Sequence, residues 1–174
     1  DQTPDNKTKS DIIEVIYNHF ESDPFLFEDF AAKIFEMHDD KVIIDEITRN
    51  SVDGGRDAIG RYRFGIKVDP IYVDFSLEAK LYRPKLSGNS ANSVGVKEVA
   101  RLVSRIRMRQ FGVLVTTSVI TEQAYKEVRG DGHPIIFICG KDIADILISH
   151  GYASITSVKL FINNYLSKWM NLSS

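Results

Sequence analysis

The sequence predicts an α/β domain in which a central mixed β-sheet is flanked by helices. The segment 71–82 alternates apolar and polar side chains throughout, which is typical of a strand with two different faces. The segments 111–116 and 134–138 are short apolar runs, as expected for strands buried on both faces. Apolar residues at helical spacing occur around these strands, so helices are available to cover the sheet.

Composition restricts the class of protein further. The 174 residues contain 22 Lys+Arg and 24 Asp+Glu, with 43% hydrophobic residues, as in an ordinary globular domain. No apolar run approaches the roughly 20 residues of a membrane span, and the single Cys139 excludes an internal disulfide and a Cys-rich zinc site. We expect a cytoplasmic protein without a membrane partner. Because the net charge is −2, a nucleic acid would have to be contacted by a local basic patch.

Start signals divide the chain into its elements. Residues 1–9 are polar and read as a tail or linker, and residues 10–174 as one domain. Ser10 is the expected N-cap of the first helix, and Asp23-Pro24 is a cap followed by proline at the start of the second. The expected order is helices from 10 and 24, strands 41–48, 57–64 and 71–82, a helix through 99–106, strand 111–116, helix 121–129, strand 134–138, and helices 141–150 and 155–169.

The run Glu78-Ala79-Lys80 is the strongest candidate for chemistry. Glu78 and Lys80 are two residues apart on the patterned strand, so a carboxylate and an ammonium leave the same polar face. Such a pair is suited to hold a divalent metal and handle charge beside one scissile bond. The same acid-x-Lys pattern at Asp5 and Asp39 has no strand to fix it. The competing interpretation is a solvated, salt-bridged strand face.

A second carboxylate comes from the glycine turn 51–57. If the two strands after this turn form a hairpin, Asp57 converges on Glu78. Two carboxylates and the carbonyl of Ala79 would give Mg²⁺ the oxygen ligands that it prefers. Asp53 is the alternative acidic member. We favour Asp57, because a strand fixes a side chain better than a turn does.

Several runs together resemble a known family, over roughly residues 24–148. They are FEDFAAKIF, SVDGGRD, LEAKLY, VGVKEVARL, GVLVTTSVITEQAYKEV and PIIFICGKDIADIL. In this order they are similar to the catalytic domain of Mrr-like restriction endonucleases, within the PD-(D/E)xK nuclease superfamily. Asp57 matches the aspartate of the glycine-turn motif, Glu78 and Lys80 match the acid-x-Lys element, and Glu28 matches an acidic position of the first family helix. Many Mrr-like members have Gln-x-Lys here, so Glu-Ala-Lys is closer to the general superfamily pattern.

The resemblance implies a restriction-endonuclease-like core and Mg²⁺-dependent hydrolysis of DNA phosphodiester bonds, with Mn²⁺ expected to substitute. Asp57, Glu78 and the Ala79 carbonyl would hold the metal, which polarises phosphoryl oxygen and acidifies water. Lys80 would position or deprotonate that water, or neutralise charge on the phosphorane. Glu28 would orient water or support a second metal; its alternative role is an ordinary carboxylate on a helix surface.

Cations gather after the proposed catalytic strand. Lys97, Arg101, Arg105 and Arg109 recur every four residues and would form a basic ridge along one helix. Phosphates supply most of the affinity of a protein for DNA, so we expect this basic ridge and Arg83 to contact double-stranded DNA. The competing interpretation is a solvated helix face, with Glu98 as the only nearby acid.

The predicted function is therefore DNA cleavage by the catalytic domain of a restriction endonuclease. The alternatives are a repair or Holliday-junction-resolving nuclease of the same fold, and a non-catalytic DNA-binding or assembly module. A separate target-recognition domain or subunit outside this chain is compatible with the sequence, which contains no base-reading motif. The apolar face of the last helix suits core packing, with a homodimer interface as the alternative; Ile155, Val158, Phe161, Ile162, Tyr165 and Trp169 form this face.

Overall fold

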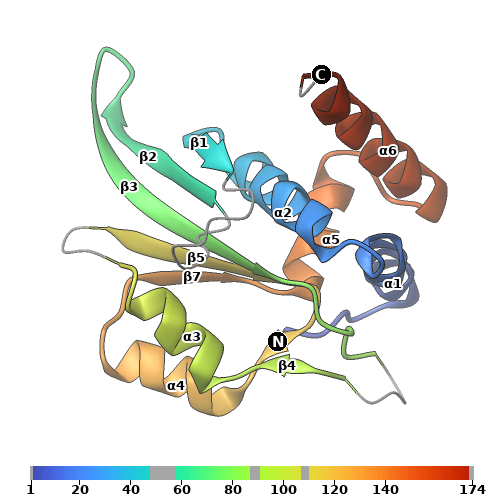
Figure 1. Ribbon diagram of the computed structural model, residues 1–174, viewed down its shortest axis with the longest axis horizontal. Coiled ribbons are helices and arrows are strands. Elements are labelled where there is room, and N and C mark those ends of the chain that lie inside the picture. The colour runs from blue at the N-terminus through green and yellow to red at the C-terminus, as the bar shows by residue number, and fades with distance from the viewer. Residues whose placement is uncertain (1, 48–57, 87–90, 107–109, 173–174) are drawn as a thin grey trace.

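A five-stranded mixed sheet with the order β1-β2-β3-β5-β7 forms the centre of the protein, in a computed structural model that describes residues 2–47, 58–86, 91–106 and 110–172 (Figure 1). The strands β1, β2 and β3 pair antiparallel, whereas β3, β5 and β7 pair parallel. The predicted α/β class with a mixed sheet is confirmed. The strands are β1 (Val42–Ile47), β2 (Ala58–Ile66), β3 (Asp69–Lys80), β5 (Phe111–Thr116) and β7 (Ile135–Ile138).

Helices cover both faces of this sheet (Figure 1). One face is covered by α1 (Lys7–Phe20), α2 (Pro24–His38) and α5 (Gly140–Ser149), with α6 (Ile155–Leu172) packed outside them. The other face is covered by α3 (Val96–Val103) and α4 (Glu122–Gly130). The short strands β4 (Ser93–Val94) and β6 (Val119–Ile120) pair beside them; the sequence pattern did not predict these two.

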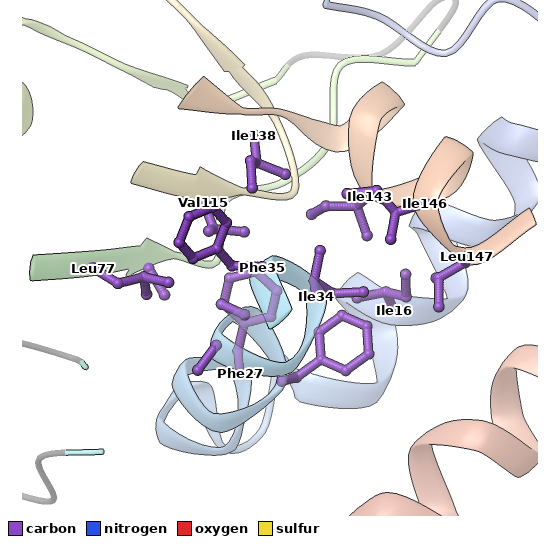
Figure 2. Close-up of a cluster of buried hydrophobic side chains, with 14 of the residues drawn as sticks. Ile16, Phe27, Ile34, Phe35, Leu77, Val115, Ile138, Ile143, Ile146 and Leu147 are labelled. Carbon is purple, nitrogen blue, oxygen red and sulfur yellow. The ribbon is translucent and has the colours of Figure 1, made fainter. Parts of the chain in front are cut away.

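The larger hydrophobic core lies under α1, α2 and α5 (Figure 2). Phe35 of α2 is buried and meets the ring of Phe75 edge to face, with ring centroids 5.1 Å apart. Leu77 of β3, Val115 of β5 and Ile138 of β7 point into the same cluster. Alternate residues of three neighbouring strands thus form one apolar face.

A smaller core lies between the sheet and α3 and α4. Leu114 of β5 is buried there with Val99 and Leu102 of α3. Gly112 allows this helix to lie close to β5, because a Cβ at that position would be 2.8 Å from Cδ1 of Ile106 and 3.1 Å from Cδ2 of Leu102. The close packing fixes where α3 ends relative to β3 and β5.

The face pattern of β3 differs from the prediction in both halves. Ile71 was expected inside, but it is 66% exposed, because this half of β3 pairs with β2 in a hairpin that extends beyond the sheet (Figure 1). Ser76 and Glu78 were expected on the polar face, and both are buried. Their half of β3 pairs with β5 and lies at the centre of the sheet, where α3 covers the second face.

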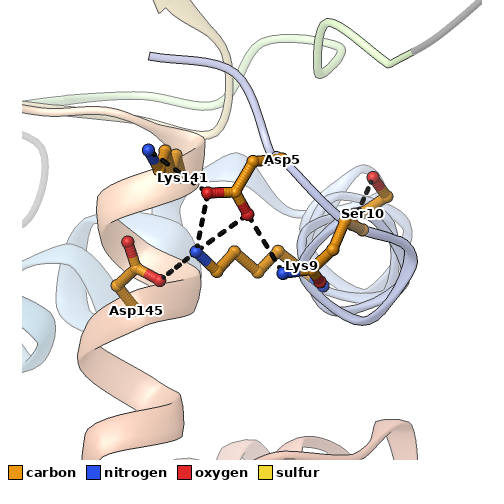
Figure 3. Close-up of polar contacts among 6 residues, drawn as sticks. Asp5, Lys9, Ser10, Lys141 and Asp145 are labelled. Carbon is orange, nitrogen blue, oxygen red and sulfur yellow. Dashed lines mark hydrogen bonds and ion pairs between the residues drawn. The ribbon is translucent and has the colours of Figure 1, made fainter. Parts of the chain in front are cut away.

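The first helix begins earlier than predicted. Asn6 is its N-cap and accepts from the backbone N–H of Lys9 at 3.0 Å, so residues 7–9 belong to the helix and Ser10 lies inside it. Lys9 forms ion pairs with Asp5 at 2.9 Å and with Asp145 of α5 at 2.7 Å (Figure 3). These contacts tie the segment before α1 to α5. The division into a linker over 1–9 and a domain over 10–174 stays a prediction.

The C-terminal helix packs inward over the part whose side chains are described. Val158 and Ile162 of α6 are buried, and Phe161 packs on Phe30 of α2. This supports the core interpretation of the helix face, although Trp169 lies outside the described side chains. Within the described part of the chain, no helix has the length and apolar character that crossing a membrane requires.

Candidate active site

The carboxylate of Glu78 lies at the end of the sheet where β3 finishes. In the parallel register Glu78 is opposite Leu114 and Lys80 is opposite Thr116, so both side chains leave β3 on the face that α3 covers. The Glu78 side chain is 0% exposed. A charge taken out of water is costly unless other groups replace the lost solvation. The site therefore depends on what surrounds this carboxylate.

Three cations surround Glu78. The Lys80 Nζ lies 2.8 Å from Oε1, Arg105 Nη1 lies 3.4 Å from Oε2, and Arg101 Nε lies 4.0 Å from Oε1. The Arg105 contact is a hydrogen bond, whereas no described residue donates a hydrogen bond to Oε1, despite its closeness to Lys80. Among the described residues, Glu78 is thus held mainly by charge, and its buried Oε1 retains an acceptor position.

The helix that carries the basic ridge is shorter than predicted. The helix α3 ends at Val103, and Arg105 follows in a tight turn in which its N–H donates to the carbonyl of Leu102 at 3.0 Å. Lys97 and Arg101 do lie on α3, where Lys97 is exposed. Arg109 lies outside the described residues. The turn after α3, rather than a continuing helix, brings Arg105 back to Glu78.

Glu98 does not pair with the basic ridge through any contact seen in the described residues. It accepts from the backbone N–H of Gly95 at 3.0 Å and from the hydroxyl of Tyr82 at 3.3 Å, which closes the first turn of α3. Burial, together with the charge of Glu98 and the hydrogen bond to it, raises the pKa of Tyr82. Glu98 therefore fixes the start of α3 and leaves Glu78 as the carboxylate near Arg101 and Arg105.

Thr117 and Tyr82 continue the link between the ends of β3 and β5, a pair that was not predicted from the sequence. The Thr117 hydroxyl donates to the Tyr82 carbonyl at 2.5 Å and accepts from the Tyr82 N–H at 3.0 Å. This buried hydroxyl bonds both backbone groups of Tyr82 and so holds the ends of β3 and β5 together two residues beyond Lys80. The doublet Thr116-Thr117 after an apolar strand was the available signal for it.

The remaining predicted residues are placed only in part. Asp57 and Asp53 lie outside the described residues; Ala58, which follows Asp57 in the sequence, pairs with Leu77 next to Glu78. Ala79 is buried, and its carbonyl as a metal ligand stays a prediction. Glu28 is half-buried on α2, and its role also stays a prediction.

Two further arginines have neighbours other than Glu78. Arg83 is exposed, and its positive charge acts on Tyr17 of α1, where burial and Glu21 raise the pKa of the Tyr17 hydroxyl and Arg83 opposes that rise. Arg61 is paired with Asp45 through two contacts of 2.8 Å. The pairing shows that Arg61 has a structural partner, while Arg83 as a DNA contact stays a prediction.

The residues present fit a divalent cation in part. Hard cations such as Mg²⁺ bind carboxylate and carbonyl oxygens, and Glu78 supplies a buried oxygen to which no described residue donates a hydrogen bond. Among the described residues no three His, Cys, Asp or Glu side chains gather as a metal site, and Asp57 is not among them. Glu78 is therefore the described carboxylate of the predicted ligand set, and Asp57 lies outside the described residues.

The fold and this cluster define a nuclease domain of the restriction endonuclease class. The chain belongs to that family: the family model of the Mrr catalytic domain, described as a restriction endonuclease, matches residues 21–147. The predicted family is confirmed. Restriction endonucleases generally use divalent metal ions.

Two solved structures are similar to the chain over nearly all of its length. The DNA modification-dependent restriction endonuclease AspBHI is 41% identical over 96% of this chain, with a TM-score of 0.84. The MspJI restriction endonuclease, in complex with a 27-mer oligonucleotide, is 24% identical over 95% of this chain, with a TM-score of 0.78, and shows the shared fold. This chain spans 42% of the AspBHI chain and 37% of the MspJI chain. No curated protein matches the chain significantly.

Proposed function

We propose that this domain hydrolyses phosphodiester bonds of double-stranded DNA with a divalent metal, Mg²⁺ in the cell and Mn²⁺ as a substitute. The observation that carries the proposal is the fully buried carboxylate of Glu78, with the ammonium of Lys80 2.8 Å away and a hydrogen-bonding position left on Oε1. A buried charge without full hydrogen bonding is costly to the fold, and such groups are concentrated at functional sites. Family membership supplies the reaction that this cluster would perform.

The residues have distinct proposed roles. Glu78, Asp57 and the carbonyl of Ala79 would hold the metal. When bound, the metal supplies a Lewis acid that polarises the phosphoryl oxygen and lowers the pKa of water. Lys80 would orient that water or neutralise charge that develops on the phosphorus oxygens, and Glu28 would orient water from α2. Lys97, Arg101, Arg105, Arg109 and Arg83 would bind DNA phosphates.

We also propose that target selection resides outside these 174 residues, in the same chain or in a separate subunit. Supporting this, the chain spans less than half of the AspBHI and MspJI chains, and AspBHI is named as dependent on DNA modification. The identity of 41% with AspBHI favours modified DNA as the target of the complete protein. Two copies acting together would cut both strands, since each chain offers one Glu78 cluster.

The decisive test is cleavage of plasmid DNA with Mg²⁺ or Mn²⁺. We expect nicking or linearisation by the wild type, and loss of at least about 10³ in rate for Glu78→Gln, because the change removes charge from a metal ligand. Glu122→Gln is the matched control: its carboxylate is 80% exposed on α4, and cleavage should be unchanged. Full activity of Glu78→Gln would contradict the proposed site.

The same assay separates the other candidate functions. A protein that shifts DNA on a gel with metal present but never cuts it is a non-catalytic binding module. Preference for a four-way junction over linear duplex indicates a junction-resolving enzyme. Cleavage of methylated but not unmethylated genomic DNA by the complete protein supports modification dependence.

The choice between the two aspartates needs its own pair of variants. We expect Asp57→Ala to abolish cleavage and Asp53→Ala to retain it, because Asp57 directly precedes the strand that pairs beside Glu78. The reverse result would assign the metal ligand to Asp53.

A further inference from the structure

Among the described residues, the charges close to Glu78 are unbalanced. The Glu78 carboxylate faces Lys80, Arg101 and Arg105 within 4.0 Å, whereas Glu98 is engaged with Gly95 and Tyr82. Three cations thus face one described carboxylate, which needs a single positive charge as its counter-ion. Excess cations at a buried carboxylate indicate that other anions are expected at the same place.

Arg105 differs from the other two cations in how it is placed. Its side chain is only 14% exposed, compared with 52% for Arg101, and it donates a hydrogen bond to Oε2 of Glu78. Its position follows from the tight turn after α3, in which the N–H of Ile106 donates to the carbonyl of Val103 at 3.1 Å. The close approach of Ile106 to Gly112 holds this turn against β5. The packed turn after α3 therefore holds the Arg105 side chain next to Glu78.

The same carboxylate cannot serve a guanidinium and a divalent cation equally well. A metal bound to Glu78 takes up its negative charge and repels a guanidinium a few ångströms away, since like charges at such distances interact strongly where water is scarce. A guanidinium released in this way prefers a planar, bidentate anion such as a phosphate. The Arg101 side chain is already half exposed, so it could move away from Glu78 into solvent. The Arg105 side chain is largely buried, so it needs another anion in place of Glu78.

We propose that Arg105 is an exchange cation of the active site: without metal it is the counter-ion of Glu78, and with metal bound it is released to the phosphate of the DNA. This inference rests on the proposed function, which makes Glu78 a metal ligand. It makes metal binding and DNA binding mutually dependent through one side chain. It also assigns to Arg105 a role that Lys97, at the other end of α3, does not have.

The first test measures metal binding in the absence of DNA, by calorimetric titration of the full chain with Mn²⁺. Removing the competing charge in Arg105→Ala should tighten Mn²⁺ binding about tenfold, and Arg105→Lys should remain close to wild type. Lys97→Ala, at the start of α3, is the matched control and should not change Mn²⁺ affinity. Arg105→Gln keeps a hydrogen-bond donor without the charge, so it gives the same answer if Arg105→Ala fails to fold. Wild-type or weaker Mn²⁺ affinity in both neutral variants would overturn the proposal.

The second test compares the affinity for a DNA duplex with Ca²⁺ and with EDTA. With Ca²⁺, Arg105→Gln should bind about tenfold more weakly than wild type, because a charged contact to phosphate is lost. With EDTA the same variant should lose less than about twofold, because in the wild type Glu78 then holds Arg105. Lys97→Ala should lose affinity equally in both conditions. Equal losses for Arg105→Gln with Ca²⁺ and with EDTA would contradict the exchange.

A third variant removes the carboxylate instead of the cation. Glu78→Gln should free Arg105, so duplex binding in EDTA should tighten several-fold, and this gain should vanish in the double variant Glu78→Gln/Arg105→Gln. None of these readouts requires cleavage. If the wild type cuts no DNA but the couplings appear, the proposed function fails and the exchange stands; if it cuts and the couplings are absent, only the exchange fails.

Discussion

Both faces of the second half of β3, from Phe75 to Ala79, are buried, but for opposite reasons. On one face Phe75 and Leu77 lie in the apolar cluster under α2. On the other, Ser76 and Glu78 lie under α3, where Glu78 is surrounded by cations. The comparison shows that burial alone does not identify a core residue. The neighbours decide whether a buried position stabilises the fold or serves chemistry.

The energetics of the two faces differ in kind. Apolar burial contributes roughly 25 cal/mol for each Å² removed from water, so the first face stabilises folding directly. A buried carboxylate contributes little net stability even when it is well paired, because desolvation offsets the attraction. The second face therefore holds a carboxylate, Glu78, that adds little to the stability of the fold. The burial of apolar side chains on the first face offsets the cost of its desolvation.

The largest difference between the faces should appear in stability. Phe35→Ala removes a buried ring that packs on Phe75, and should lower the free energy of unfolding by about 3–5 kcal/mol. Urea unfolding measures the change. Phe25→Ala is the matched control on the same helix: Phe25 is 62% exposed, so the effect should stay within about 0.5 kcal/mol. A small loss for Phe35→Ala would mean that the apolar face is not the stabilising one.

A substitution on the second face should lower the rate of DNA cleavage rather than the stability of the fold. Lys80→Ala should lower single-turnover cleavage by roughly 10²–10³, as when one preorganised charge is removed from a transition state. Its unfolding free energy should change by less than about 1 kcal/mol, since Arg105 still pairs with Glu78. Unchanged cleavage would remove Lys80 from the mechanism. A large loss of stability would show that the ion pair supports the fold.

The smallest effect concerns a polar contact at the edge of the apolar face. The hydroxyl of Tyr62 on β2 donates to Asp39 at the end of α2. Burial alone would raise the pKa of Asp39, but the hydrogen bonds from Tyr62 and from the Lys41 N–H lower it below 3.8. The hydrogen bond to Asp39, with burial, raises the pKa of Tyr62 to about 12.

A lowered carboxyl pKa stabilises the fold above pH 3.8 and loses this contribution as the pH falls through the folded value. The raised Tyr62 pKa contributes below pH 10 and is lost as the pH rises toward about 12. Tyr62→Phe should therefore cost about 1 kcal/mol at pH 7, and less at pH 3. Urea unfolding at both pH values measures this, and an equal cost at pH 3 and pH 7 would exclude the charged Asp39 as the partner.

Local pattern determined much of the fold. The apolar runs over 111–116 and 134–138 became β5 and β7 within one residue. The strand β5 is buried on both faces as its apolar run indicated, whereas β7 lies at the edge of the sheet and leaves Ile136 37% exposed. Asp23 caps α2 as its sequence indicated, accepting from the N–H of Phe25 at 3.2 Å. Buried Cys139 has a pKa raised to about 12 by burial, as suits a small core residue rather than a nucleophile.

Tertiary contacts decided the rest, because they join residues that local periodicity treats separately. The alternation in 71–82 predicted that Ser76 and Glu78 share a polar face, but not that α3 packs over that face and buries both residues. The four-residue spacing of the cations predicted that Arg105 lies on the helix. The helix α3 ends at Val103 instead, and the turn that follows directs the Arg105 guanidinium to Glu78. The sequence alone determined which strand carries the acid and the lysine. Only the packing of α3 against β5 decided that the acid is buried among cations, since the energy of a charge depends on neighbours that lie distant in the chain.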